Sequence, residues 1–156
     1  FDGYFEIVAS TYFPTLRQFP HPLTTSGEQK ASLASATILG SIGMSITGAP
    51  LDGSRALLQA SAVDCEGNVM APGVSISISS ADAGTTVAYG GTTPTKGSTS
   101  TTTAGGVSRA FAFNVPPGPA QVTGKLEASG ATIHTWPVLF RGGFSTSIGL
   151  EPLPPK

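Results

Sequence analysis

The sequence predicts an all-β protein, an antiparallel β-sandwich of seven to nine short strands with one short helix near residues 36–44. Segments in which apolar and polar residues alternate recur along the 156-residue chain. Turn signals separate these segments at intervals of roughly 8–12 residues, as in sandwich proteins. The 20 glycines and 13 prolines supply those turns. Hydrophobic residues make up 39% of the chain, which is enough to form a core.

Two extended segments open the chain, at residues 3–10 and 11–19. Their strand, break and second strand resemble residues 121–140, so they read as the last hairpin of a preceding sandwich. We expect residues 1–30 to form this N-terminal hairpin and a Pro/Thr-rich connection, residues 31–150 the sandwich, and residues 151–156 a Pro-rich tail. The hairpin could fold back on its own sandwich, or its strands could be donated to a neighbouring subunit.

The predicted helix begins after Ser35, which is a suitable N-cap, and runs from Ala36 to about Met44. Gly40 and Gly43 weaken it by about 1 kcal/mol each. We expect the helix to cover an open end or edge of a sheet, because exposed edges need protection.

Four extended or looped segments follow. Residues 55–64 form a strand with Leu57, Gln59, Ser61 and Val63 on one side and Ala56, Leu58, Ala60 and Ala62 on the other. Residues 74–79 alternate most regularly, with Val74, Ile76 and Ile78 directed at the core. A short strand at 85–91 is followed by the polar, low-complexity segment 92–106, which predicts a long exposed loop.

The remaining strands complete the sandwich. Residues 107–115 place Val107, Arg109, Phe111, Phe113 and Val115 on one side. A corner at 116–118 leads to strands at 119–129 and 131–140, and residues 144–150 form the closing strand.

Two short motifs resemble a known family. One is the sequence from Val63 to Asn68 followed by Ala71-Pro72-Gly73-Val74, and the other is the glycine turn at 105–106 with a Phe-containing strand and the Pro-Pro-Gly corner at 116–118. Over about residues 55–150, the chain resembles the carboxypeptidase regulatory-like domains, which are transthyretin-like (prealbumin-type), Ig-like sandwiches. The resemblance implies a seven-stranded secreted or surface-attached domain without catalytic residues. The family's usual Asp before the glycine turn is replaced here by Ala104.

Charge composition excludes several classes of partner. Charged residues are only 11% of the chain and the net charge is −1. Because no basic patch is visible, we expect no nucleic-acid binding. No stretch reaches the roughly 18 apolar residues of a membrane helix, so we expect no membrane insertion.

Residues with metal or catalytic chemistry are sparse. Asp64, Glu66 and Asn68 place oxygen ligands at alternate positions, a weak calcium candidate that Asp52 or Asp82 could complete. His21, His134 and the single Cys65 lie on distant segments, which argues against zinc. No nucleophile–base motif is present, so we expect no enzyme and no cofactor.

Two functions remain. The first is an extracellular or cell-surface structural protein that self-associates by strand addition into a filament or surface layer. Its partners would be other copies of the same chain or neighbouring domains of a longer chain. Its candidate assembly residues are Tyr4, Phe5, Ile7, Val8, Tyr12 and Phe13. The alternative is a monomeric secreted adhesion or carbohydrate-binding module that uses the rings of Trp136 and Tyr89.

Overall fold

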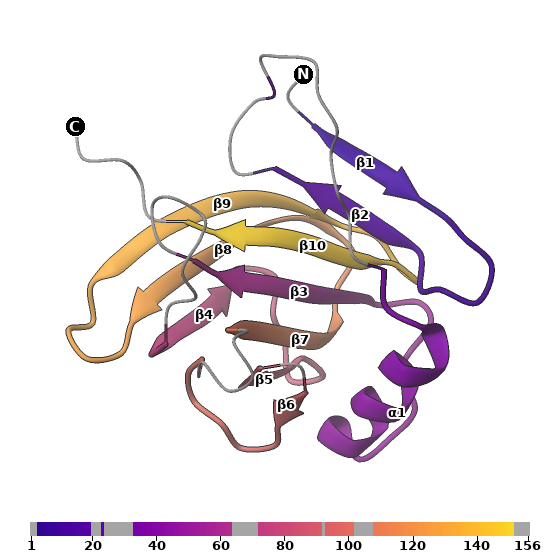
Figure 1. The fold of residues 1–156 in the computed structure, drawn as a ribbon, viewed down its shortest axis with the longest axis horizontal. Coiled ribbons are helices and arrows are strands. Elements are labelled where there is room, and N and C mark those ends of the chain that lie inside the picture. Colours follow the sequence, from indigo (N-terminus) through magenta and orange to yellow (C-terminus); the bar gives the residue numbers. More distant parts are fainter. Residues whose placement is uncertain are drawn as a thin grey trace.

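Ten strands and one helix make up the part of the chain that the computed structural model describes, which is residues 3–19, 23, 33–63, 72–91, 93–101 and 108–151 (Figure 1). In chain order the elements are β1 (Tyr4–Ile7), β2 (Thr15–Gln18), α1 (Ala36–Thr47), β3 (Ala56–Ala62), β4 (Val74–Ile78), β5 (Thr86–Gly90), β6 (Pro94–Thr95), β7 (Arg109–Val115), β8 (Gly118–Leu126), β9 (Thr132–Phe140) and β10 (Ser145–Leu150). The all-β sandwich is confirmed, with ten strands among the described residues instead of the seven to nine expected.

The strands form a large and a small sheet. The seven-stranded sheet has the order β1-β2-β10-β3-β7-β5-β6, and the three-stranded sheet has the order β4-β8-β9. The expectation of a purely antiparallel sandwich is wrong at β10, which runs parallel to both β2 and β3. The chain reaches β10 from β9 in the other sheet, and no hairpin within the large sheet fixes its direction. Alternation of side chains carries no information about strand direction.

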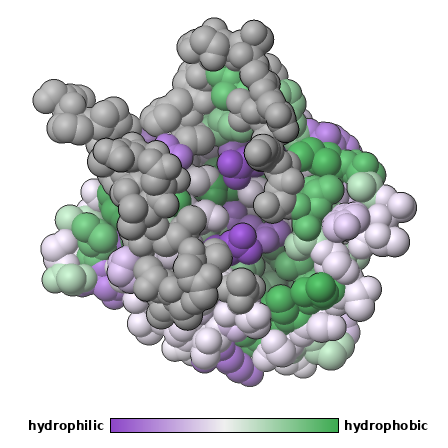
Figure 2. All heavy atoms as spheres, viewed as in Figure 1, coloured by the Kyte–Doolittle hydropathy of each residue, from purple (hydrophilic) through white to green (hydrophobic). Residues whose placement is uncertain are grey.

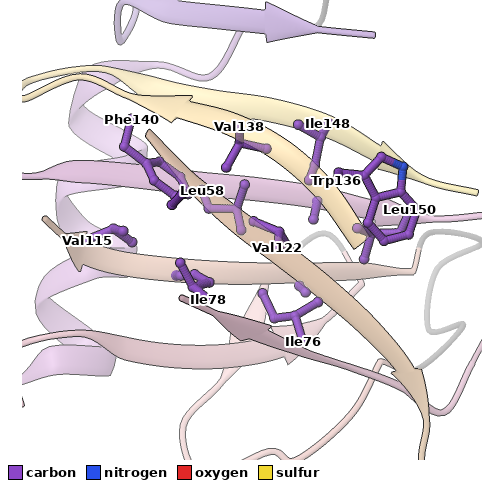
Figure 3. Packing of buried hydrophobic residues seen from close by; sticks show 14 of the residues in the cluster. Leu58, Ile76, Ile78, Val115, Val122, Trp136, Val138, Phe140, Ile148 and Leu150 are labelled. Carbon is purple, nitrogen blue, oxygen red and sulfur yellow. The ribbon is translucent and has the colours of Figure 1, made fainter. Parts of the chain in front are cut away.

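The main core lies between the two sheets (Figure 3). Leu58, Val122 and Phe140 are among its fully or almost fully buried side chains. The predicted faces of β3 and β4 are confirmed, because Ala56, Leu58, Ala60 and Ala62 of β3 and Val74, Ile76 and Ile78 of β4 all point into this core. The small alanines of β3 let the opposite sheet pack closely.

The predicted face of β7 is wrong at Val115. Phe111 and Phe113 lie on the outer side of the large sheet, whereas Val115 points into the core between the sheets. Asn114, between Phe113 and Val115, has a left-handed backbone (φ 55°), and the pairing with β3 shifts by one residue there. This β-bulge reverses the side of every residue that follows it.

Helix α1 packs on the outer face of the large sheet. Leu39 and Ile46 contact a second apolar cluster that contains Leu57, Phe111 and Phe113. The helix therefore covers the outer face of the large sheet and contacts β5 and β6 at the edge of that sheet, which agrees in part with the cover of an open end or edge that we expected. It ends at Gly48, whose left-handed backbone (φ 81°) closes the last turn by donating to the Met44 carbonyl at 2.9 Å.

The segment at 92–106 is only partly the exposed loop that its composition predicts. Pro94 and Thr95 form β6 beside β5, and Pro94 is buried. Thr101 is also buried, at 2% exposure. Residues 92 and 102–107 lie outside the described part of the chain. The polar composition of this segment predicted that it is exposed. It could not show that Thr101 is buried, because a buried threonine with hydrogen-bond partners cannot be recognised from sequence.

Candidate assembly edge

The edges of the two sheets decide where another strand could add, because an edge strand carries backbone groups that its own sheet does not pair. The small sheet ends at β4 and β9, and the large sheet ends at β1 and β6.

Side chains and a neighbouring loop close the β4 edge. The hydroxyl of Tyr89 accepts a hydrogen bond from the Ile76 N–H at 2.9 Å and also contacts the Ile76 carbonyl at 3.4 Å. At the strand's start, Val74 donates to the Thr101 hydroxyl at 2.9 Å and accepts from the Thr101 N–H at 2.9 Å. These bonds occupy the outward backbone groups of Val74 and Ile76, which an added strand would need.

The N-terminal hairpin closes the β9 edge at Leu139. The Gln18 side-chain amide donates to the Leu139 carbonyl at 2.9 Å and accepts from the Leu139 N–H at 3.3 Å. The Thr146 hydroxyl donates to the same carbonyl at 3.0 Å. Pro137 lies two residues before Leu139, so it places its missing N–H on the same outward side.

The β6 edge is short. Only Pro94 and Thr95 pair with β5. Beyond them, the Ser98 hydroxyl accepts from the Tyr89 N–H at 2.7 Å and donates to the Tyr89 carbonyl at 3.0 Å. A strand could therefore find little backbone to pair with at this end of the large sheet.

β1 is the remaining edge, and its register shows which groups face outward. The Pro14 carbonyl accepts from the Ser145 N–H at 2.8 Å, so even-numbered residues of β2 face β10 and odd-numbered ones face β1. Because Phe5 pairs with Arg17 and Ile7 with Thr15, the backbone groups of Tyr4 and Glu6 point away from the sheet. No further strand pairs with β1 in the described part of the chain.

Exposed apolar side chains gather on the same hairpin. Tyr4, Phe5, Val8 and Tyr12 are 41%, 40%, 67% and 45% exposed, and Ile7 and Phe13 are partly buried. Figure 2 shows apolar atoms at the surface on the side of the molecule where the β1–β2 hairpin and α1 lie. Five of the six predicted assembly residues thus lie on β1 and in the turn after it, whereas Phe13 packs against the apolar cluster beneath α1.

The hairpin folds back on its own sandwich, which is one of the two arrangements left open by the sequence. β2 pairs with β10, and the Glu6 carboxylate forms an ion pair with Arg141 at 2.7 Å. The turn is attached to the segment before α1, where Phe13 donates to the Ala34 carbonyl at 2.9 Å and Ala36 to the Thr11 carbonyl at 3.1 Å. These contacts hold β1 in place at the end of the large sheet.

The two predicted glycan-binding rings lie in the core. Trp136 is 4% exposed and Tyr89 is 5% exposed, and both belong to the cluster between the sheets (Figure 3 shows Trp136). Burial raises the pKa of the Tyr89 hydroxyl above its usual value. Neither ring can stack on a sugar in this fold. Alternation assigned these residues to a side of their strands but did not show that the side is covered.

The calcium candidates are not brought together in the described residues. Asp64, Glu66 and Asn68 lie outside them, as do Cys65 and His21. Asp82 forms an ion pair with Arg55 at 2.5 Å, which lowers the pKa of its carboxyl group, and Asp52 accepts from the Ser54 hydroxyl at 2.6 Å. Within the described ranges, no group of three or more His, Cys, Asp or Glu side chains could hold a metal ion.

Sequence reasoning missed the residues that close the other edges, above all Gln18 and Thr101. Only in retrospect does the sequence point to Gln18, because this long amide side chain lies on the same side of β2 as the buried Leu16. Thr101 lies in a polar segment that resembles a spacer and carries no such signal.

No protein family, curated protein or solved structure matches the chain. Among the described helical residues, none form a helix that is long and apolar enough to cross a membrane.

Proposed function

We propose that this protein is a non-enzymatic structural module that self-associates by strand addition at β1. The observation that carries the proposal is the contrast between edges. Specific side-chain bonds close β4 at Val74 and Ile76 and β9 at Leu139, and β6 is two residues long. By contrast, β1 directs the backbone of Tyr4 and Glu6 outward beside exposed aromatic side chains. Closing some edges and leaving one available is how sheet proteins direct association.

The geometry favours pairing of two β1 strands across a twofold axis. Such a contact uses the same surface twice and closes after two subunits. The filament or surface layer expected from the sequence would need a second, different acceptor edge. The opposite end of the large sheet offers only β6, so a dimer is the better-supported assembly.

An extracellular or cell-surface location belongs to the same proposal, supported by the low charge content. The kinship with carboxypeptidase regulatory-like domains also stays a prediction. Its first motif lies mostly outside the described residues, and its Pro-Pro-Gly corner joins β7 to β8. With Trp136 and Tyr89 in the core, no observation favours the glycan-binding alternative.

A matched pair of substitutions at Glu6 tests the edge. Because the Glu6 N–H points outward, Glu6→Pro removes a donor that a partner strand needs while sparing the bonds between β1 and β2. Glu6→Gln removes the ion pair with Arg141 but keeps the N–H, and serves as the control. We expect the parent chain and Glu6→Gln to sediment as dimers at high protein concentration, and Glu6→Pro to sediment as a monomer.

Circular dichroism and thermal melting will establish that both variants fold. A Glu6→Pro protein that is folded and still dimeric would overturn the proposed edge. A parent chain that stays at its 15.7 kDa monomer mass at all concentrations would overturn self-association itself.

A further inference from the structure

The outer face of the large sheet is divided into two halves. α1 covers the apolar half, over Leu57, Phe111 and Phe113. The other half is polar and is not covered by the helix. It carries Arg17 of β2, Ser147 of β10, Gln59 and Ser61 of β3, and Arg109 of β7. The two halves meet along β7. Arg109 at its start is half-buried, and the residues that directly follow it are buried.

A hollow of about 250 Å³ lies over this polar half, and Leu33 and Ala34 form part of its wall. Its depth follows from the sizes of the side chains. Ser61 pairs in register with Gly149, and Ser147 lies beside Arg17, so small residues form the middle of the surface and arginines stand on two sides. In Figure 2, hydrophilic atoms are visible near the centre of the face shown.

Arg17 presents donors that its own chain does not fully use. One guanidinium nitrogen, Nη1, donates to the Ser147 hydroxyl at 3.2 Å, and the guanidinium lies 5.6 Å from the centre of the Phe19 ring. The Nε atom is buried and has no hydrogen-bond partner. Burial lowers the pKa of Arg17, and the nearby charge of Glu151 acts in the opposite direction. A buried N–H donor without an acceptor is costly and rare in folded proteins.

Arg109 stands on the other side of the hollow and is half-buried. Its guanidinium makes no ion pair or side-chain hydrogen bond with the described residues, and its cross-strand neighbours are Ser61 and Gly90. Because these two neighbours are small, the guanidinium N–H donors of Arg109 are accessible from the hollow. Two arginines, two serine hydroxyls and the Gln59 amide therefore surround one space, and Glu151 is the acidic group that acts on Arg17.

We propose that this hollow binds the oxyanion group of a small organic molecule, with the anion between Arg17 and Arg109 and the apolar part against Leu33 and Ala34. Guanidinium groups bind carboxylates and phosphates through paired, charge-assisted hydrogen bonds. The volume and the apolar wall favour an organic anion over a bare ion. This site lies on the sheet face and does not depend on self-association through the β1 edge.

Three probes of similar shape test the proposal on the full chain. Benzoate carries a carboxylate, phenyl phosphate carries a phosphate, and benzyl alcohol carries no charge. We expect saturable shifts of the Arg17 and Arg109 Nε–Hε NMR signals with one or both anions and none with the alcohol. The anion that binds more tightly identifies the carboxylate or the phosphate as the preferred group.

Charge-removing variants assign the binding to the hollow. We expect Arg109→Gln and Arg17→Gln each to weaken binding of the preferred anion at least tenfold, and Lys125→Gln, an exposed position on β8, to change it less than twofold. Arg109→Gln is decisive if Arg17→Gln fails to fold. Equal binding of benzyl alcohol, absence of any saturable shift, or unchanged binding by Arg109→Gln would each overturn the proposal.

Discussion

At the scale of the residue, one hydroxyl group contributes to both the core and an edge. Tyr89 extends from β5 through the core to β4, where its hydroxyl accepts from the Ile76 N–H. Tyr89→Phe keeps the ring but leaves that buried N–H without an acceptor. We expect the free energy of unfolding, measured by urea denaturation, to fall by about 1–3 kcal/mol. Tyr12→Phe, at an exposed tyrosine, is the control and should change it by less than about 0.5 kcal/mol.

The same residue predicts a dependence of stability on pH. Burial raises the pKa of Tyr89 in the folded protein, whereas an unfolded tyrosine ionises near pH 10. Above that pH the unfolded chain releases a proton that the folded chain retains, so the stability contributed by Tyr89 is present below about pH 10 and is lost as the pH rises. We expect the parent chain to lose stability above pH 10 more steeply than Tyr89→Phe. Parallel curves would contradict this assignment.

At the scale of the element, helix α1 contains two glycines in contrasting surroundings. A methyl group at Gly40 would meet no atom within 4 Å, whereas at Gly43 it would collide with Leu51 side-chain atoms, including Cγ at 2.6 Å. Gly40→Ala should therefore stabilise the protein by up to about 1 kcal/mol through helix propensity. Gly43→Ala must displace Leu51 from the cluster beneath the helix, and we expect it to lower stability. Thermal melting compares the two, and equal melting temperatures would contradict the packing described for α1.

At the scale of the whole molecule, local patterns predicted the sandwich, the two sides of β3 and the inward face of β4, because alternation reports directly on the side of a strand. Alternation could not reveal the bulge at Asn114, which turns Val115 inward, or the parallel direction of β10. It also could not show that Tyr89 and Trp136 are covered by a second sheet. Arg109 could have been noticed in the sequence, because it is a charged residue on the same side of its strand as Phe111 and Phe113. The candidate edge was predicted through its exposed apolar residues, but the closing of the other edges depends on contacts between distant segments, such as Gln18 with Leu139.

That contact predicts how the assembly changes when a second edge opens. Gln18→Ala removes both side-chain bonds to Leu139 and leaves the β9 edge with only the Thr146 hydroxyl and Pro137 to protect it. A subunit with two available edges can add partners on both sides, so closed dimers should give way to larger species. Sedimentation velocity at increasing protein concentration measures the change. Gln121→Ala, at an exposed glutamine on β8, is the matched control and should behave as the parent chain does. If Gln18→Ala forms no species larger than those of the control, the Gln18 side chain does not limit association at β9.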